Sequence, residues 1–224
     1  MLLRWMRAIT APLRLRILSF ACNRLKSRQG RRTSLLDVSI LAIAWGNPGY
    51  AAGFSYLQHI SERTSNTKGT ILECGSGATT LLIGSLLHHD DRRIIVLEHD
   101  QNWHAYLSRI ANQLGLDNVT LLHTPLVNYG NFEWYDIEKA LDEECIEKDI
   151  GLVICDGPPG KTPGGRYGLM PIAGGMFSDH CVVLLDDTHR KAEQTIIENW
   201  RREYCPNSHQ LRFKTHTEII SCRS

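Results

Sequence analysis

Residues 70–80 of this chain read TILECGSGATT. The first five form an apolar run of strand length, and Gly75 and Gly77 then allow a tight turn at which a ligand can lie against bare backbone. The helix predicted to follow directs its free amide groups into the same space. A strand, a glycine turn and a helix in this order indicate the first unit of an α/β sheet with a ligand-binding loop.

Apolar runs and helical segments alternate around this stretch. Strands are predicted near 70–74, 93–98, 119–123, 151–155 and 181–186. Helices are predicted near 34–45, 50–63, 78–88, 101–115, 135–146, 166–177 and 189–204. This alternation predicts a doubly wound, mostly parallel sheet with helices on both faces. The final stretch, 210–222, is β-rich and is expected to form a closing antiparallel strand pair.

The composition is that of one compact domain. The 224 residues are 42% hydrophobic and 22% charged, which excludes a disordered chain, collagen and a coiled coil. The seven cysteines are spread singly, so the sequence has neither a disulfide framework nor a Cys-x-x-Cys metal motif. We therefore expect a reducing, cytoplasmic location.

Charge divides the chain unevenly. Residues 1–32 hold nine of the 25 Lys and Arg and none of the 24 acidic residues, so the remainder carries a net charge of −8. The apolar residues of this segment recur at helical spacing, which predicts a basic amphipathic helix interrupted near Pro12. Frequent arginines exclude a membrane span. We divide the chain into a basic N-terminal arm, 1–32, and a main domain, 33–224.

Three interpretations of the arm remain open. It is a surface anchor for anionic lipid, an organellar presequence, or a solvated basic tail or simple packing helix. No basic stripe interleaved with aromatic residues continues into the main domain, so nucleic acid is not an expected partner.

A second acidic residue strengthens the loop assignment. The strand Ile94–Glu98 ends in a carboxylate 23 positions after Gly75, where it can bind the hydroxyls of a ribose. The loop departs from the dinucleotide pattern, because Thr80 replaces the third glycine and Glu73 precedes the turn. A carboxylate at that place repels a pyrophosphate and suits a cationic ligand, which makes a nicotinamide-dependent reductase the least favoured reading.

The pattern Glu73-x-Gly75-x-Gly77 with Glu98 resembles the cofactor site of class I S-adenosylmethionine-dependent methyltransferases. The resemblance covers about two thirds of the chain and implies a Rossmann-like, seven-stranded sheet. It implies that the cofactor contacts the following residues: Glu73, Gly75, Ser76, Gly77, Glu98, Thr124 and Asp156. The segment after the third strand, 123–126, lacks the small-acidic pair usual beside adenine.

Three aspartates follow the fourth and fifth strands. Asp156 ends one strand, and Asp186 and Asp187 end the next, so the three carboxylates should meet at one edge of the sheet. Oxygen ligands of this kind suit Mg²⁺. In the alternative interpretation, Asp187 caps a helix and Asp186 serves a backbone turn.

The aspartate pattern resembles the metal-dependent O-methyltransferases of the catechol and macrolide-sugar kinds, as does the stretch Arg166-Tyr167-x-x-x-Pro171. The resemblance implies that Asp156, Asp186 and Asp187 hold Mg²⁺ against a substrate hydroxyl. The catechol enzymes place a general-base lysine three residues after the first aspartate, whereas Lys161 lies five after Asp156. Lys161 and His189 are therefore both candidate bases.

These observations predict transfer of a methyl group from S-adenosylmethionine to an oxygen of a small hydroxylated molecule, assisted by Mg²⁺. The alternatives are a metal-independent methyltransferase and a non-catalytic cofactor-binding subunit. A loop of the kind used by base-methylating enzymes is not matched, because Gly157 separates the acid from the prolines and Gly160 replaces the aromatic residue. Peripheral membrane contact through residues 1–32 and a homodimer complete the expectations.

Overall fold

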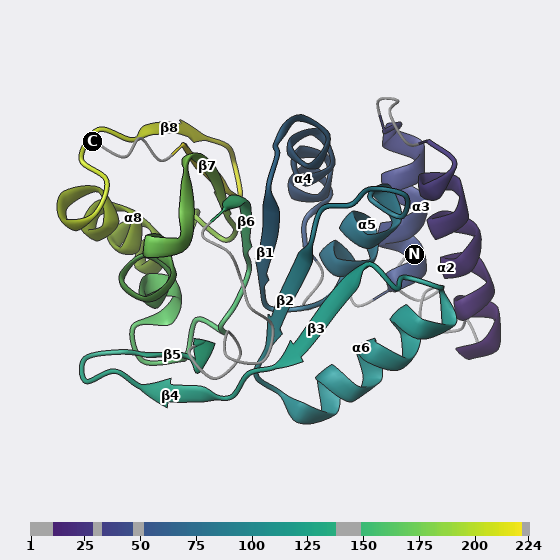
Figure 1. Ribbon diagram of the computed structural model, residues 1–224, viewed down its shortest axis with the longest axis horizontal. Coiled ribbons are helices and arrows are strands. Elements are labelled where there is room, and N and C mark those ends of the chain that lie inside the picture. Colours follow the sequence, from purple (N-terminus) through teal and green to yellow (C-terminus); the bar gives the residue numbers. More distant parts are fainter. Residues whose placement is uncertain (1–10, 29–32, 47–51, 138–148, 221–224) are drawn as a thin grey trace.

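The protein is built on a seven-stranded sheet. The computed structural model describes residues 11–28, 33–46, 52–137 and 149–220 (Figure 1). The sheet has the strand order β3-β2-β1-β6-β7-β9-β8. Its strands are β1 (Thr70–Cys74), β2 (Ile94–Glu98), β3 (Val119–His123), β6 (Ile150–Cys155), β7 (Phe177–Leu185), β8 (His209–Arg212) and β9 (Thr217–Ile220). β9 runs antiparallel to β7 and β8, whereas the pairs among β3, β2, β1, β6 and β7 are parallel. The predicted doubly wound sheet with a closing antiparallel pair is confirmed.

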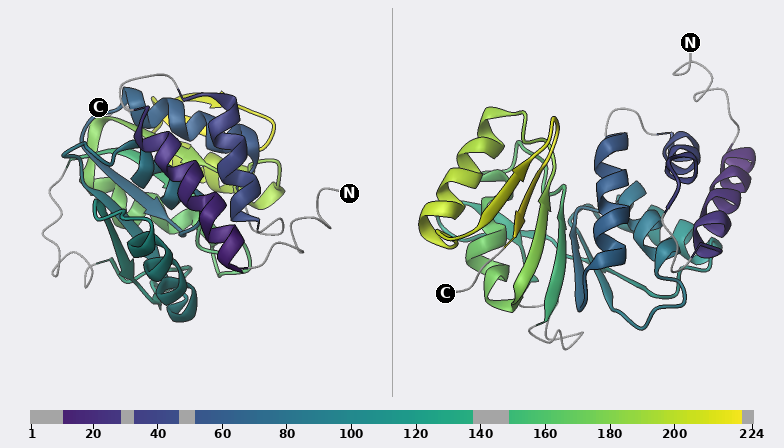
Figure 2. Two further views of the ribbon diagram at one scale, coloured as in Figure 1. Left: turned by 90° about the vertical axis from the view of Figure 1, so that its right-hand side faces the viewer. Right: turned by 90° about the horizontal axis from the view of Figure 1, so that it is seen from above.

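Helices cover both faces of the sheet. They are α2 (Ala11–Lys26), α3 (Leu35–Trp45), α4 (Phe54–Asn66), α5 (Ala78–Leu86), α6 (Gln101–Gln113) and α8 (Lys191–Glu203). Figure 2 shows α2, α3 and α4 on one side of the sheet and α8 on the other. The central strands are buried on both faces: Ile71 packs into the cluster under α2 to α6, and its neighbour Leu72 into the opposite cluster with α8. This two-sided burial explains why the strands are continuous apolar runs.

Two sequence predictions differ from the structure. Residues 166–177 were predicted to form one helix but form three short turns: η1 (Gly165–Gly168), η2 (Leu169–Ala173) and η3 (Gly174–Met176). The hydrogen bonding changes from one turn to the next, and Gly164 and Gly165, with φ angles of 74° and 54°, bend the chain where the first turn begins. The helix predicted over 135–146 begins inside a strand, and its stretch from 138 lies outside the described residues. Sequence reasoning also missed the hairpin of β4 (Leu126–Asn128) and β5 (Glu133–Tyr135), whose strands of three residues carry no readable period.

The described part of the basic arm is packed against the domain. Four residues of α2 are buried in the core cluster on the face of the sheet that α2 to α6 cover: Leu18, Ala21, Cys22 and Leu25. Pro12 is the second residue of α2 as described, so the helix continues without a break from Pro12 to Lys26. Within the described ranges, every helix is too short or too polar to cross a bilayer. The predicted contact with anionic lipid stays a prediction.

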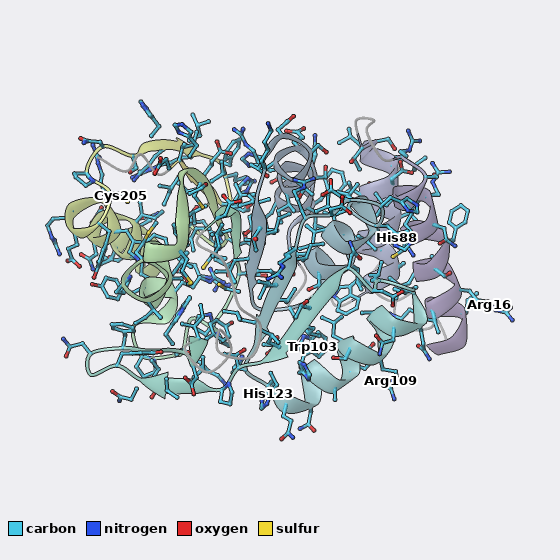
Figure 3. The ribbon with its side chains drawn as sticks, viewed as in Figure 1. Arg16, His88, Trp103, Arg109, His123 and Cys205 are labelled. Carbon is cyan, nitrogen blue, oxygen red and sulfur yellow. The ribbon has the colours of Figure 1, made fainter. Side chains whose placement is uncertain are left out.

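Salt bridges and hydrogen bonds fix α2 in place. Asp37, fully buried on α3, pairs with Arg24 (2.7 Å) and Arg28 (2.5 Å). Lys26 Nζ donates to the carbonyl oxygens of Leu114 (2.8 Å) and Gly115 (3.0 Å), just beyond the end of α6. The opposite side of α2 is open to solvent, with Arg16 directed away from the protein (Figure 3).

Candidate active site

The glycine loop lies at the carboxyl end of β1, where the strand order changes direction between β1 and β6. Gly75 has a φ of 86°, and a Cβ there would lie 2.9 Å from the backbone nitrogen of Gly157. This glycine is therefore required by close contact between two backbones. Gly77 is different, because a Cβ there would meet no described atom within 4 Å. The loop is thus tightly packed beneath Gly75 and open above Gly77.

Thr80, which replaces the third glycine of the dinucleotide pattern, has a local function. Its hydroxyl oxygen accepts a hydrogen bond from the backbone N–H of Gly77 (2.9 Å), at the start of α5. Gly77 is the N-cap residue of α5 and has no side chain with which to cap the helix. Thr80 gives the backbone N–H of Gly77 a hydrogen-bond partner that it would otherwise lack. The departure from the dinucleotide pattern is therefore a structural feature of this loop.

Glu73 lies beneath the loop and is fully buried. Thr79 donates a hydrogen bond to its Oε1, and its Oε2 has no partner among the described residues. Burial raises the pKa of Glu73 to about 8, against the opposing effect of the threonine hydrogen bonds. The side chain is therefore mostly protonated at neutral pH, and it does not present the negative charge that the sequence suggested for a cationic ligand.

Glu98 ends β2 at the same edge and is 4% exposed. Its Oε2 accepts hydrogen bonds from the backbone N–H (3.1 Å) and the hydroxyl (2.7 Å) of Ser76, and its Oε1 accepts one from the backbone N–H of Asp100 (2.9 Å). His99 Nδ1 lies 3.1 Å from Oε1. Burial alone would raise the pKa of Glu98, but these hydrogen bonds lower it below its usual value. Glu98 is therefore an ionised carboxylate that already orders the glycine loop.

Two further side chains frame this half of the edge. Thr124, almost fully buried, donates its backbone N–H to the carbonyl oxygen of Glu98 (2.7 Å) and so joins the ends of β3 and β2. Trp103, in the first turn of α6, donates its indole N–H to the carbonyl oxygen of Ser76 (3.1 Å). Trp103 and His123 lie toward this edge in Figure 3. The sequence analysis missed Trp103, because nothing in a helical pattern marks one aromatic residue as a contact of the loop.

The other half of the edge holds the predicted aspartates, together with Arg166. Arg166 Nη2 donates to Asp156 Oδ1 (3.0 Å) and to Asp187 Oδ2 (3.0 Å). The same nitrogen donates to the carbonyl oxygen of Asp156 (2.5 Å), and Nη1 donates to that of Asp186 (2.8 Å). Glu193 Oε1, on α8, lies 3.6 Å from Nη1. Arg166 is 2% exposed, so one buried guanidinium connects the ends of β6 and β7.

The pKa values in this cluster follow from burial and from its charges. Burial raises the pKa of Asp156 above its usual value, although Arg166 opposes the shift. Burial and the negative charge of Asp156 raise the pKa of Asp186 to about 7. Burial alone would lower the pKa of Arg166, but Asp156 raises it above its usual value, so the guanidinium stays charged.

The donor set does not fit the predicted magnesium site. Asp156 and Asp187 do approach one another, but the cation between them is the guanidinium of Arg166. Within residues 11–28, 33–46, 52–137 and 149–220, no three His, Cys, Asp or Glu side chains are grouped to hold one metal ion. Asp186 directs its backbone carbonyl oxygen, not its carboxylate, to the cation. Arg166 occupies the place assigned to the metal, and we derive no step through Mg²⁺.

The two predicted bases lie outside this cluster. Lys161 and His189 are both exposed, and neither forms an ion pair with the aspartates in the described part of the chain. Lys161 instead lines a small cavity with Arg190 and Glu193. Asp156 is the predicted catalytic residue that lies at the edge, with 28% of its side chain exposed.

Sequence reasoning missed two other parts of the site. It quoted Arg166 only as part of a resemblance and assigned it no partner, although it lies ten positions after Asp156. Tyr135, at the end of β5, is fully buried, and its hydroxyl has no hydrogen-bond partner among the described residues. A Cβ on Gly157 would collide with that hydroxyl, so Tyr135 lies directly against the loop after β6. The hairpin that positions Tyr135 left no signal in the sequence.

Comparison of the sequence with protein-family models and with curated proteins finds no match. Solved structures do match the fold. The SAH-bound Podospora anserina methyltransferase PaMTH1 has a TM-score of 0.59 at 16% identity, over 84% of this chain and 88% of that one. A candidate caffeoyl-CoA O-methyltransferase of Staphylococcus aureus has a TM-score of 0.58 at 14% identity, over 82% and 91% of the two chains. A candidate O-methyltransferase of Klebsiella pneumoniae has a TM-score of 0.55 at 16% identity, over 84% and 90%.

The chain therefore has the fold of these proteins, and the resemblance found in Gly75, Gly77 and Glu98 is confirmed at the level of the fold. At these identities the likeness concerns the path of the backbone, while function depends on individual residues at the carboxyl edge.

Proposed function

We propose that this protein transfers a methyl group from S-adenosylmethionine to a hydroxyl oxygen of a small molecule, without a metal ion. The observation that carries the proposal is the loop at 75–77, which is packed against Gly157 on one side and open above Gly77 on the other. It lies where strand order reverses, which is the usual ligand position in an open α/β sheet. The methyltransferases that share the fold support the same reading.

The residues present fit the cofactor. The backbone of Gly75, Ser76 and Gly77, the carboxylate of Glu98 and the segment at Thr124 would hold it, while the buried Glu73 would support the loop from below. When bound, the cofactor supplies a methyl group on a positively charged sulfur. Glu98 already accepts hydrogen bonds from Ser76 and Asp100, so a sugar hydroxyl would join or replace these contacts.

Asp156 has the position and the surroundings of a general base. Its carboxylate is partly exposed, follows β6 directly and is oriented by Arg166. Burial raises its pKa, which improves its ability to accept a proton from a hydroxyl group. In this arrangement Asp156 accepts the hydrogen bond of the acceptor hydroxyl and then its proton, while the fixed geometry supplies proximity.

Arg166 makes a metal-independent reaction the better reading of the cluster. A buried guanidinium within 3.0 Å of both Asp156 and Asp187 provides the positive charge that a divalent ion would bring. Its Nη2 donates to both the carboxylate and the carbonyl oxygen of Asp156, which fixes the direction of that carboxylate.

A binding titration tests the cofactor assignment. Calorimetric titration of S-adenosylmethionine into the protein should give micromolar affinity, equal in magnesium and in chelator. Gly77→Val should weaken binding at least about tenfold, because its side chain enters the open space above the loop. Gly175→Val is the matched control, since a Cβ there also meets no described atom within 4 Å. Absence of binding to the unchanged protein, or equal binding by Gly77→Val, would contradict the assignment.

Turnover tests the reaction itself. Release of S-adenosylhomocysteine should depend on a hydroxylated acceptor and should be unaffected by chelator. Asp156→Asn should remove most of this turnover while leaving cofactor affinity within about twofold, because Asn accepts no proton. Binding without turnover for any hydroxylated acceptor would favour the non-catalytic cofactor-binding subunit.

A further inference from the structure

A cleft of about 620 Å³ lies beside the aspartate cluster. It is bounded by the β4–β5 hairpin, by the glycines that precede and start η1, and by α8. Three aromatic rings form one wall: Tyr129 is stacked on Phe132 at 5.5 Å between centroids, and Phe132 meets Tyr167 edge-on at 5.3 Å. The cleft therefore offers an aromatic wall and the volume to accept one small organic molecule.

The charged residues that line this cleft are acidic. Glu193 and Glu203 line it, and no Lys or Arg is among its lining residues. The carboxylate of Glu203 accepts hydrogen bonds from the Tyr167 hydroxyl (2.6 Å) and from Arg202 (2.6 Å). The basic side chains Lys161 and Arg190 line the smaller, neighbouring cavity instead.

Glu193 is the unusual member of the lining. It is 2% exposed, and its Oε2 has no hydrogen-bond partner among the described residues. Its Oε1 lies 3.6 Å from Arg166, which is too long for a hydrogen bond. A buried carboxylate oxygen without a partner is costly, and a cationic ligand next to aromatic faces is the partner that offsets this cost best.

We propose that this cleft binds the ammonium group of an amine-bearing aromatic methyl acceptor, with Glu193 as the ion-pair partner and Tyr129, Phe132 and Tyr167 as the aromatic wall. The assignment of the ligand as acceptor rests on the proposed function. Arg166 supports it, because the same guanidinium lies against Glu193 and is hydrogen-bonded to Asp156. Glu193 in the cleft wall and Asp156, the residue proposed to take the proton, thus lie on either side of one buried guanidinium.

Two probes that differ in charge test the proposal. Tyramine carries a phenol and an ammonium group, and 3-(4-hydroxyphenyl)propionate carries the same phenol with a carboxylate. Each is titrated calorimetrically into the unchanged protein at pH 7 and low salt, without S-adenosylmethionine. Tyramine should bind at least about tenfold more tightly than the acid. Equal affinities, preference for the acid, or no heat with tyramine at millimolar concentration would overturn the proposal.

Matched variants locate the binding. Glu193→Gln keeps the shape of the side chain, removes its charge and should weaken tyramine binding roughly tenfold or more. Glu198→Gln, on the exposed side of the same helix, should leave binding unchanged. Thr195 is exposed and lines the cleft, so Thr195→Arg should block it with a positive charge even where Glu193→Gln folds poorly. Unchanged tyramine affinity in Thr195→Arg contradicts the assigned cleft.

A separate titration distinguishes this proposal from the proposed function. S-adenosylmethionine is titrated into Glu193→Gln and Thr195→Arg, and its affinity should equal that of the unchanged protein. Tyramine binding in a protein that binds no S-adenosylmethionine would uphold the cleft and overturn the methyl transfer. Cofactor binding without tyramine binding would overturn the cleft and leave the cofactor assignment standing.

Discussion

The two halves of the carboxyl edge balance their charges differently. At the carboxyl ends of β1 and β2, the ionised Glu98 accepts hydrogen bonds from backbone amides and a hydroxyl, and open space remains above Gly77. At the carboxyl ends of β6 and β7, the buried guanidinium of Arg166 forms ion pairs with the carboxylates of Asp156 and Asp187. One half is arranged to receive a ligand, and the other already contains its counter-ion. A run of strand-end aspartates in a sequence therefore does not identify a metal site until the nearby arginines have been placed.

The largest effect should come from removing the internal cation. Arg166→Met leaves Asp156, Asp187 and Glu193 without their common partner, and it leaves two buried carbonyl oxygens unpaired. We expect a loss of about 3–5 kcal/mol in the free energy of unfolding, measured with denaturant at pH 7. A variant as stable as the unchanged protein would show that Arg166 does not hold the cluster together.

The second effect depends on pH and concerns Glu73. The pKa of Glu73 is raised from 4.5 to about 8 in the folded protein. The contribution of this group to the free energy of unfolding is therefore greatest below pH 4.5 and is lost as the pH rises to about 8. Glu73→Gln removes that loss and keeps an acceptor for the Thr79 hydroxyl. We expect the variant to gain up to about 4 kcal/mol over the unchanged protein between pH 5 and pH 8.

Thermal or denaturant unfolding at these two pH values measures the gain. The difference between variant and unchanged protein cancels the contributions of other titrating groups such as Asp186. A difference that is the same at pH 5 and pH 8 would show that Glu73 titrates normally.

A third prediction separates the two glycines of the loop. Gly75→Ala introduces a Cβ at a positive φ and against the Gly157 backbone, and should cost about 1–3 kcal/mol of stability. Gly77→Ala has an extended φ of 172° and open space, so its stability should change by less than about 0.5 kcal/mol. Denaturant unfolding of the two variants provides the measurement. Equal destabilisation would mean that the loop is equally tight at both positions.

The smallest effect concerns the second arginine on the same aspartate. Arg190 Nη1 lies 2.8 Å from Asp187 Oδ2, but its side chain is 51% exposed. Arg190→Met should therefore cost less than about 1 kcal/mol, again measured by denaturant unfolding. A loss comparable with that of Arg166→Met would mean that burial is not what distinguishes the two arginines.

The sequence predicted those strands and turns whose conformation depends on their own residues. The apolar runs ending at Cys74, Glu98, His123 and Cys155 are strands close to the predicted positions, because parallel strands covered on both faces are mostly apolar. The glycine loop was likewise readable, since its conformation requires glycine at Gly75 itself. The conformation of the segment after Asp156 could not be predicted, because it is set by contacts with β5 and α8, which are distant in the sequence.

The roles of the charged residues could not be predicted for a related reason. The spacing of Asp156, Asp186 and Asp187 brings them to one edge, but it does not say which cation lies between them. The answer depended on the side-chain direction of Arg166, which is fixed by the turns of η1 and by the carbonyl oxygens at two strand ends. The pKa of Glu73 was equally hidden, since its place within β1 does not report how completely its carboxyl group is buried.

The hydrogen bonds from Lys26 to Leu114 and Gly115 have a consequence for synthesis on the ribosome. During synthesis α2 is made before all of these partners: α3 follows directly, α5 begins 52 residues after Lys26, and Leu114 and Gly115 follow 88 and 89 residues after it. Until α5 is made, α3 alone can cover the apolar residues of α2, such as Leu18, Ala21 and Leu25. This helix therefore stays partly uncovered on the nascent chain, and its arginines reduce the risk of aggregation during that interval.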